Sequence, residues 1–286
     1  MKLSNQEKAD ILVQALPYIQ RYNGEIIVVK FGGNAMTSEE QKLSTMRDLV
    51  LLAQVGIKVV LVHGGGPEID NVLDKMHIET KRLNGLRVTD DEQMNVVQMV
   101  LAGKVNKDLV ASIESVGGTA LGLCGVDGGM IKATVMAPEL GHVGEIVSVN
   151  AKPILDALNC GYIPVISTIA YDKSGNIYNI NADTAASRIA GALKAHSLIN
   201  MTATKGVLLD PKDESTLIPE IKIEEVDGLK AKGVISGGMI PKVECCVEAI
   251  NLGVKNVFII DGRVPHAILV EVLSDEGIGT MFCKEA

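Results

Sequence analysis

Several patterns that mark extracellular, membrane or nucleic-acid-binding proteins are missing from this sequence. Its five cysteines are odd in number and show no C-x-x-C spacing, which argues against a disulfide scaffold or a structural zinc site. The formal charge is −8 and no run of lysine or arginine exceeds two residues, so we expect neither nucleic acid nor a membrane surface as a partner. No apolar stretch is long enough to span a membrane, and the polar start lacks the apolar core of a signal peptide. Together these absences predict a cytoplasmic protein.

The sequence does contain enough apolar residues for a large core. Hydrophobic residues make up 47% of the 286 positions, and at this length one core begins to split into two lobes. Apolar, β-rich runs occur at residues 25–30, 58–63, 119–124, 163–169, 197–201 and 256–260. Stretches with helical spacing lie between most of them, at 90–116, 151–160, 182–195 and 241–253. The alternation predicts an α/β fold with a mainly parallel central sheet and helices on both faces.

Shorter features suggest how this fold is divided. Segments around 78–88, 130–149 and 171–180 predict hairpins, which often act as lids beside such a sheet. The turn-rich stretch before Asn179 is the best candidate for a boundary, so we expect lobes at 25–178 and 179–286. Residues 1–24 predict a separate helical arm, with capping-box spacing at Ser4 and Glu7. Its apolar stripe either packs on its own subunit or forms an exposed arm that pairs with another subunit.

Two glycine-rich turns follow the first two predicted strands. They read KFGG at 30–33 and HGGGP at 63–67. Ligands of parallel sheets bind beyond the carboxyl ends of strands, where glycines allow close approach to backbone N–H groups, and Pro67 suits the start of a helix. Neither turn fits G-x-x-x-x-G-K-[ST] or G-x-G-x-x-G, so neither a P-loop nor a dinucleotide fold is supported. Each turn alone could be an ordinary strand-to-helix connection.

Two later stretches add charge to the same predicted edge. NINAD at 179–183 places Asn179, Asn181 and Asp183 on one side of an extended segment, with Asp183 at the start of a helix. SGGMIPK at 236–242 ends in Lys242, again near a helix start. Taken separately, Asp183 could merely cap its helix and Lys242 could be solvated.

The combined charges indicate phosphoryl transfer. Two lysines, Lys30 and Lys242, with glycine N–H donors and an aspartate between them, suit the negative oxygens of a phosphoryl group in its loose transition state. No histidine has the setting of a catalytic base, except that His63 stays a candidate. A carboxylate acceptor needs no base because an acid of pKa ~4 is ionised at pH 7, whereas an alcohol usually needs one. The residues therefore favour phosphorylation of a carboxylate by a nucleotide.

The motifs, in chain order, resemble those of the amino acid kinase family over nearly the whole chain. They read KFGGNA at 30–35, VHGGGP at 62–67, NGLRVT at 84–89, GHVG at 141–144, NINAD at 179–183, STLIPEI at 215–221 and GGMIPK at 237–242. The resemblance implies an open αβα sandwich whose N-terminal lobe holds an amino acid and whose C-terminal lobe holds ATP. The NGLRVT segment resembles the corresponding segment of one branch of the family. That branch phosphorylates the side-chain carboxylate of N-acetyl-L-glutamate, the second step of arginine biosynthesis.

The resemblance also implies catalytic roles for individual residues. Lys30 and Lys242 would stabilise the transition state, and Asp183 would hold both lysines in place. Backbone N–H groups of Gly33 and Gly65 would contact the phosphoryl group.

On the substrate side, Gly65 and Gly66 would line the amino acid. Arg87 would pair with its α-carboxylate, for which a fork of donors is suited. Asn179 would hydrogen-bond nearby.

The nucleotide would lie against the turn TATKGVL at 202–208, through Thr202, Ala203, Gly206 and Leu208, together with Lys242. The family commonly has T-D-V-x-G-V-L here, so Ala203 replaces an aspartate and any contact made by that acid is lost. Mg²⁺ would bridge the β- and γ-phosphates, and no protein ligand for it can be named from the sequence.

Regulation by L-arginine is a further implication of the resemblance. Arginine-inhibited relatives have an N-terminal helix that joins dimers into a hexamer, a trimer of dimers, and a tail like residues 266–280. Tyr22, Glu271 and Gly277 would bind arginine, although many sensitive relatives have a histidine where this chain has Phe258. A nitrogen-status signalling protein is a candidate partner.

Three alternatives stay open at this point. An acetylaminoadipate kinase, or another kinase that forms an acyl phosphate, would act on a substrate that differs by as little as one methylene, which is worth only ~1–3 kcal/mol of discrimination. A non-catalytic arginine or nitrogen sensor would not need Lys30, Asp183 and Lys242 together. A dinucleotide-dependent oxidoreductase would need the glycine fingerprint that is missing here.

Overall fold

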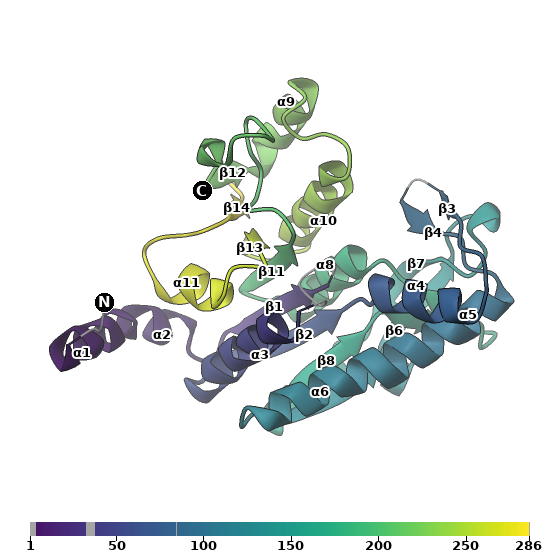
Figure 1. The fold of residues 1–286 in the computed structure, drawn as a ribbon, viewed down its shortest axis with the longest axis horizontal. Helices are drawn as coiled ribbons and strands as arrows, with labels where there is room; N and C mark the ends of the chain where they lie inside the picture. The colour runs from purple at the N-terminus through teal and green to yellow at the C-terminus, as the bar shows by residue number, and fades with distance from the viewer. Residues whose placement is uncertain (1–3, 33–37, 84, 286) are drawn as a thin grey trace.

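The centre of the molecule is one large sheet. A computed structural model describes residues 4–32, 38–83 and 85–285. The strands of this sheet are β1 (Ile26–Phe31), β2 (Lys58–His63), β5 (Ala120–Cys124), β8 (Ile163–Ser167), β11 (Ser197–Thr202), β12 (Glu220–Lys222), β13 (Asn256–Asp261) and β14 (Thr280–Cys283). Within the described residues their order is β12-β14-β13-β11-β1-β2-β8-β5, and every pairing is parallel except β13 with β14 (Figure 1). The mainly parallel α/β fold predicted from the sequence is confirmed, and all six predicted runs form strands of this sheet.

Helices cover the sheet on both faces. Their bounds are α3 (Glu39–Gln54), α4 (Gly66–Lys75), α5 (Asp91–Gln98), α6 (Asn106–Ser115), α7 (Lys152–Asn159), α8 (Ala182–Leu193), α9 (Val226–Ala231), α10 (Met239–Asn251) and α11 (Ala267–Leu273). A π-helical segment, η2 (Met99–Val105), joins α5 to α6, so the predicted helix at 90–116 is one long rod. Short 3-10 turns occupy Asp127–Gly129, Pro138–Leu140, Glu214–Thr216 and Ile223–Glu225. Helices α3 and α6 pack on one face of the sheet and α7, α8 and α10 on the other.

The alternation of side chains along β1 aims its lysine. Ile27 and Val29 point into the apolar cluster beneath α3 and α6, whereas Val28 points into the cluster beneath α8. Because side chains of a strand alternate with a period of two, Lys30 lies on the same face as Val28. That face is the one covered by α8, whose first turn carries Asp183.

Strand order also decides where a ligand can bind. β1 pairs with β2 on one side and with β11 on the other, so later strands of the chain lie on both sides of β1. Loops at the carboxyl ends of such central strands separate and leave a crevice. The lobe boundary expected near residues 178 and 179 stays a prediction.

All three predicted hairpins form beside this crevice. A four-stranded sheet has the order β10-β9-β6-β7 and contains β6 (Ile131–Val135), β7 (Gly144–Val149), β9 (Ile169–Tyr171) and β10 (Ile177–Asn179). A separate two-stranded sheet contains β3 (Arg82–Leu83) and β4 (Leu86–Arg87). Arg82 and Arg87 are direct cross-strand partners in it.

The N-terminal arm consists of two helices, α1 (Asn5–Gln14) and α2 (Leu16–Tyr22), that extend from the body (Figure 1). The predicted capping box forms: Ser4 Oγ accepts from the Glu7 N–H, and Glu7 Oε2 accepts from the Ser4 N–H. None of the residues of α1 is buried, and Leu12 is 75% exposed. The prediction that the apolar stripe packs on its own subunit is therefore wrong for α1. The alternative prediction, an exposed arm, agrees with this exposure. No helix in the described residues has both the length and the apolar character that crossing a membrane requires.

Candidate functional site

A carboxylate held between two lysines forms the centre of the site. Lys30 Nζ lies 2.9 Å from Asp183 Oδ1, and Lys242 Nζ lies 3.0 Å from Asp183 Oδ2. The Lys30 side chain is 8% exposed and that of Lys242 is 33% exposed. Three elements distant in sequence, β1, α8 and α10, therefore bring two cations and one anion together, leaving one net positive charge.

Asp183 is not the cap of its helix, and Lys242 is not merely solvated. Helix α8 is capped by Asn181, whose side chain accepts hydrogen bonds from the backbone N–H groups of Asp183 and Thr184. The Asp183 carboxylate is thus free to bridge the lysines, and Lys242 is ion-paired rather than only solvated. Burial raises the pKa of Asp183, but the Lys30 and Lys242 ammonium groups outweigh burial and hold it below its usual value.

A polar cavity of about 240 Å³ opens beside this cluster. It brings the residues expected to bind the amino acid, Gly65, Gly66, Arg87 and Asn179, together with Lys30 and Asp183, which were expected to be catalytic. Gly33 lies outside the described residues. Gly65 is needed for close packing, because a Cβ atom there would lie 2.7 Å from Leu101 Cδ2 on η2.

Arg87 is held from behind by two contacts with α4. Its side chain is 4% exposed, Nη1 lies 2.6 Å from Asp70 Oδ1, and Nη2 donates to the Gly66 carbonyl oxygen at 3.3 Å. Asp70 Oδ2 also contacts Arg82 Nη2 at 2.9 Å. Asp70 was missed by the sequence reasoning, because it belongs to no motif and meets the two arginines only through the fold.

The base candidate His63 is closed off from the cavity. It is fully buried, its Nδ1 lies 2.9 Å from the Gly64 carbonyl oxygen, and its Nε2 lies 3.1 Å from Asn106 Nδ2. A carbonyl can only accept, so Nδ1 carries the proton and Nε2 accepts from Asn106. Burial lowers the pKa of His63 to about 4. The hypothesis that His63 acts as a base is therefore wrong. The imidazole ring instead fixes the glycine turn at residues 63–67.

A second cavity, of about 460 Å³, lies on the other side of Lys242. Its walls include every residue expected to contact the nucleotide: Thr202, Ala203, Gly206, Leu208 and Lys242. Val234 and Met239 add apolar surface, which suits a flat ring. Thr202 Oγ1 accepts from the Thr204 N–H and donates to the Thr204 carbonyl, which shapes the turn although Ala203 brings no acid. The Lys30–Asp183–Lys242 cluster thus stands between the two cavities.

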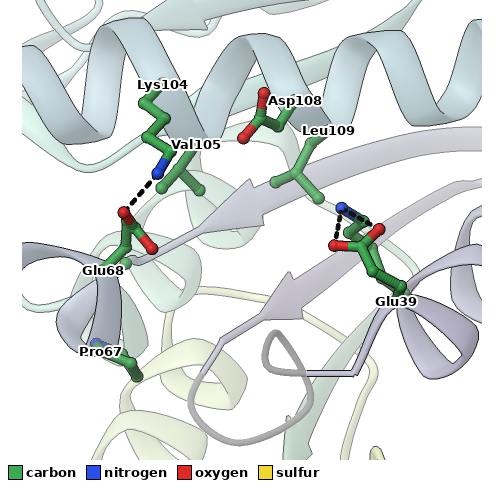
Figure 2. A pocket seen from close by; sticks show the side chains of 9 residues that line it. Glu39, Pro67, Glu68, Lys104, Val105, Asp108 and Leu109 are labelled. Carbon is green, nitrogen blue, oxygen red and sulfur yellow. Dashed lines mark hydrogen bonds and ion pairs between the residues drawn. The ribbon is translucent and has the colours of Figure 1, made fainter. Parts of the chain in front are cut away.

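The described residues contain no group of three or more histidine, cysteine or acidic side chains placed to hold a metal ion. A third cavity, of about 390 Å³, lies behind the glycine turn, between α3, α4 and the long helix (Figure 2). Lys104 pairs there with Glu68 at 2.5 Å, which fastens the first turn of α4 to η2 (Figure 2).

A fourth cavity, of about 440 Å³, lies where the arm meets the C-terminal tail. The residues expected to bind an effector, Tyr22, Glu271 and Gly277, all line it, together with Phe258. Glu271 Oε2 accepts from the backbone N–H groups that follow Gly277, at 2.9 and 3.2 Å, and burial raises the pKa of Glu271. Arg21 and Asp275 supply further charges of both signs.

Comparison with known proteins places this arrangement among kinases. The profile of the amino acid kinase family matches residues 25–261. Acetylglutamate kinase from Brachyspira hyodysenteriae is 54% identical over 285 residues, which covers 99% of both chains, and that from Clostridium beijerinckii is 52% identical over 282 residues, or 98% of this chain and 99% of the relative. Among solved structures, N-acetylglutamate synthase from Neisseria gonorrhoeae, complexed with coenzyme A and N-acetyl-glutamate, superposes with a TM-score of 0.85 at 24% identity. That match covers 97% of this chain and 64% of the synthase chain, and it shows likeness of fold.

Proposed function

The chain belongs to the amino acid kinase family, and from this premise we propose that it phosphorylates the side-chain carboxylate of N-acetyl-L-glutamate with ATP. The product is N-acetyl-L-glutamyl 5-phosphate, and the reaction is the second step of arginine biosynthesis. The observation that carries the proposal is the Lys30–Asp183–Lys242 cluster between a small polar cavity and a larger apolar one. Relatives about half identical over the full chain support the substrate.

The chemistry asks mainly for positioning and charge. Lys30 and Lys242 are placed to neutralise the oxygens of a phosphoryl group as it passes between the cavities, and Asp183 keeps both ammonium groups at that point. No base is required because the acceptor carboxylate is already ionised at neutral pH. The enclosed position of His63 agrees with that.

The cavity walls suit the two substrates. Arg87 is positioned for the α-carboxylate of N-acetyl-L-glutamate, Asn179 lies beside it, and Gly65 and Gly66 expose N–H groups at the start of α4. The apolar cavity at residues 202–208 would hold the adenine ring of ATP, with Lys242 at its polar end. When bound, ATP supplies the phosphoryl group and Mg²⁺ offsets the charge of its phosphates. A cytoplasmic location stays a prediction.

We expect ATP-dependent trapping of an acyl phosphate as hydroxamate with N-acetyl-L-glutamate. The matched comparison is N-acetyl-L-2-aminoadipate, which is one methylene longer and should react with a kcat/KM at least about tenfold lower. Preference for the longer acid would replace the proposed function by an acetylaminoadipate kinase. Absence of turnover with either acid would favour a sensor that retains the fold.

For regulation, we propose that the exposed arm joins dimers into a hexamer and that L-arginine inhibits the enzyme from the cavity between arm and tail. The cavity offers Glu271 and Asp275 to a guanidinium group and Arg21 to a carboxylate. Phe258 contributes no hydrogen bond where a histidine is common, so inhibition at millimolar arginine is expected to be weaker than in relatives with that histidine. The apolar stripe of α1 supplies the surface for association.

Replacing Leu12 and Val13 together by aspartate should reduce the mass in solution from that of a hexamer to that of a dimer. Both side chains are exposed, at 75% and 66%, so the change removes an association surface without disturbing the core. Light scattering after gel filtration measures the mass, and Gln14→Asp on the same helix is the control. An unchanged mass in the double variant would remove the basis for the hexamer.

A further inference from the structure

The ion cluster around Arg87 contains a residue, Asp70, that has no part in the reaction as described so far. Asp70, on α4, divides its carboxylate between two arginines of the β3–β4 hairpin: Oδ1 contacts Arg87 at 2.6 Å and Oδ2 contacts Arg82 at 2.9 Å. Both arginines line the cavity, whereas Asp70 is not among the described residues that line it. Asp70 therefore lies behind the cavity wall and contacts that wall through its two arginine partners.

This contact stabilises the β3–β4 hairpin. Its strands are two residues long and pair only with each other in the described sheets, and such a small ribbon is marginal by itself. Arg82 and Arg87 are directly opposite, and like charges in that position destabilise a hairpin. One carboxylate between two guanidinium groups removes the repulsion and leaves a single net positive charge, which matches one substrate carboxylate.

The same contact restricts the direction of Arg87. Asp70 binds Nη1 and the Gly66 carbonyl oxygen binds Nη2, so the guanidinium plane is fixed at both ends against α4. Arg87 also lines the cavity, so its other N–H groups are available to a ligand there. Burial raises the pKa of Asp70, but hydrogen bonds and charge from the two arginines outweigh it and lower the pKa, so the group is ionised at neutral pH.

We propose that Asp70 is a positioning residue that aims Arg87 at the α-carboxylate of the substrate and holds Arg82 beside it. The inference rests on the proposed function, because it needs a substrate with a second carboxylate. A competing effect has the opposite sign: the negative charge of Asp70 lowers the attraction of the arginines for any anion. Fixed direction outweighs this effect in our proposal, because an arginine fork binds a carboxylate well only when both donors are aligned.

The test measures the kinetics of Asp70→Asn against the unmodified enzyme in the hydroxamate assay. We expect KM for N-acetyl-L-glutamate to rise about tenfold, kcat to stay within about threefold, and KM for ATP to stay unchanged. This pattern is expected because the lost interaction stabilises the bound substrate and the transition state equally. Asp70→Glu should recover part of the loss, because it restores the charge. Asp74→Asn, one turn further along α4 and exposed, is the matched control.

A substrate change separates positioning from general damage to the fold. With the α-amide of N-acetyl-L-glutamate, the ratio of kcat/KM between Asp70→Asn and the unmodified enzyme should return to about one, because the group that Arg87 recognises is gone. A tenfold defect that persists with the amide, or a KM that is unchanged or lower with the natural acid, would overturn the positioning role alone. An unmodified enzyme that does not turn over N-acetyl-L-glutamate would overturn the proposed function together with this inference.

Discussion

Lys30→Met is expected to lower kcat by about a thousandfold while the protein remains folded. The substitution keeps an unbranched side chain of similar length on β1 but removes the ammonium group that lies 2.9 Å from Asp183. A charged donor aimed at developing negative charge in an enclosed site contributes about 4 kcal/mol to the transition state, which corresponds to that loss of rate. Lys30 is almost buried, so water cannot take over its role.

The measurement is steady-state kinetics with saturating N-acetyl-L-glutamate and ATP, accompanied by urea unfolding of both proteins. Lys58→Met is the matched control, because Lys58 lies at the amino end of β2, where it pairs with Ile26 at the start of β1. The control should keep kcat within about twofold. A Lys30→Met enzyme that remains folded and keeps kcat within about threefold would show that Lys30 has no essential electrostatic role.

The fold was largely predictable because its strongest signals are local. Runs such as IIVVKF and KVVLVH are buried on both faces, so they must be rich in branched apolar residues whatever surrounds them. The hairpin segments carry their own turn chemistry, as at Gly175, where φ is +85°. The capping box at Ser4 and Glu7 is equally local, and it formed as predicted.

Features that depend on contacts between distant segments could not be predicted in the same way. Asp70 meets Arg82 and Arg87 only because α4 lies against the hairpin. His63 looked accessible beside its glycines, but the long helix brings Asn106 onto its ring and excludes water. The exposed face of α1 has the same spacing of apolar residues as the face of a buried helix. Whether such a face is buried depends on which other elements pack against it, and the sequence of the helix does not specify them.

The site itself was predictable to the extent that its motifs are. Lys30, Asp183 and Lys242 were found from glycine turns and strand ends, and they do come together. The division of roles at the start of α8 was not visible, because Asn181 and Asp183 are both residues that commonly cap helices. Only the hydrogen bonds show that Asn181 caps α8 and that the carboxylate of Asp183 is left for the lysines.

That division of roles leads to the second large effect, which is expected for Asp183→Asn. The amide has the same shape and still accepts hydrogen bonds, but it no longer offsets the charges of Lys30 and Lys242, which lie about 3 Å from its oxygens. The two ammonium groups then repel each other without a bridge, and their spacing is no longer set. We expect kcat to fall about a hundredfold, since misplacement by about 1 Å costs that much, with smaller changes in either KM.

Stability provides an independent measurement of the same charge. The pKa of Asp183 is lowered in the folded protein, so its contribution to the free energy of unfolding is present above the usual value of 3.8 and is lost as the pH falls below it. The difference in unfolding free energy between the unmodified protein and Asp183→Asn should therefore narrow as the pH is lowered from 5 to 3. The control is Asp156→Asn, which breaks an exposed ion pair with Lys152 whose atoms lie 2.5 Å apart. This variant should keep full activity, and its unfolding free energy should differ little from that of the unmodified protein at either pH. Equal kcat for Asp183→Asn and the unmodified enzyme, with a stability difference that does not depend on pH, would mean that the lysines are held in place without this carboxylate.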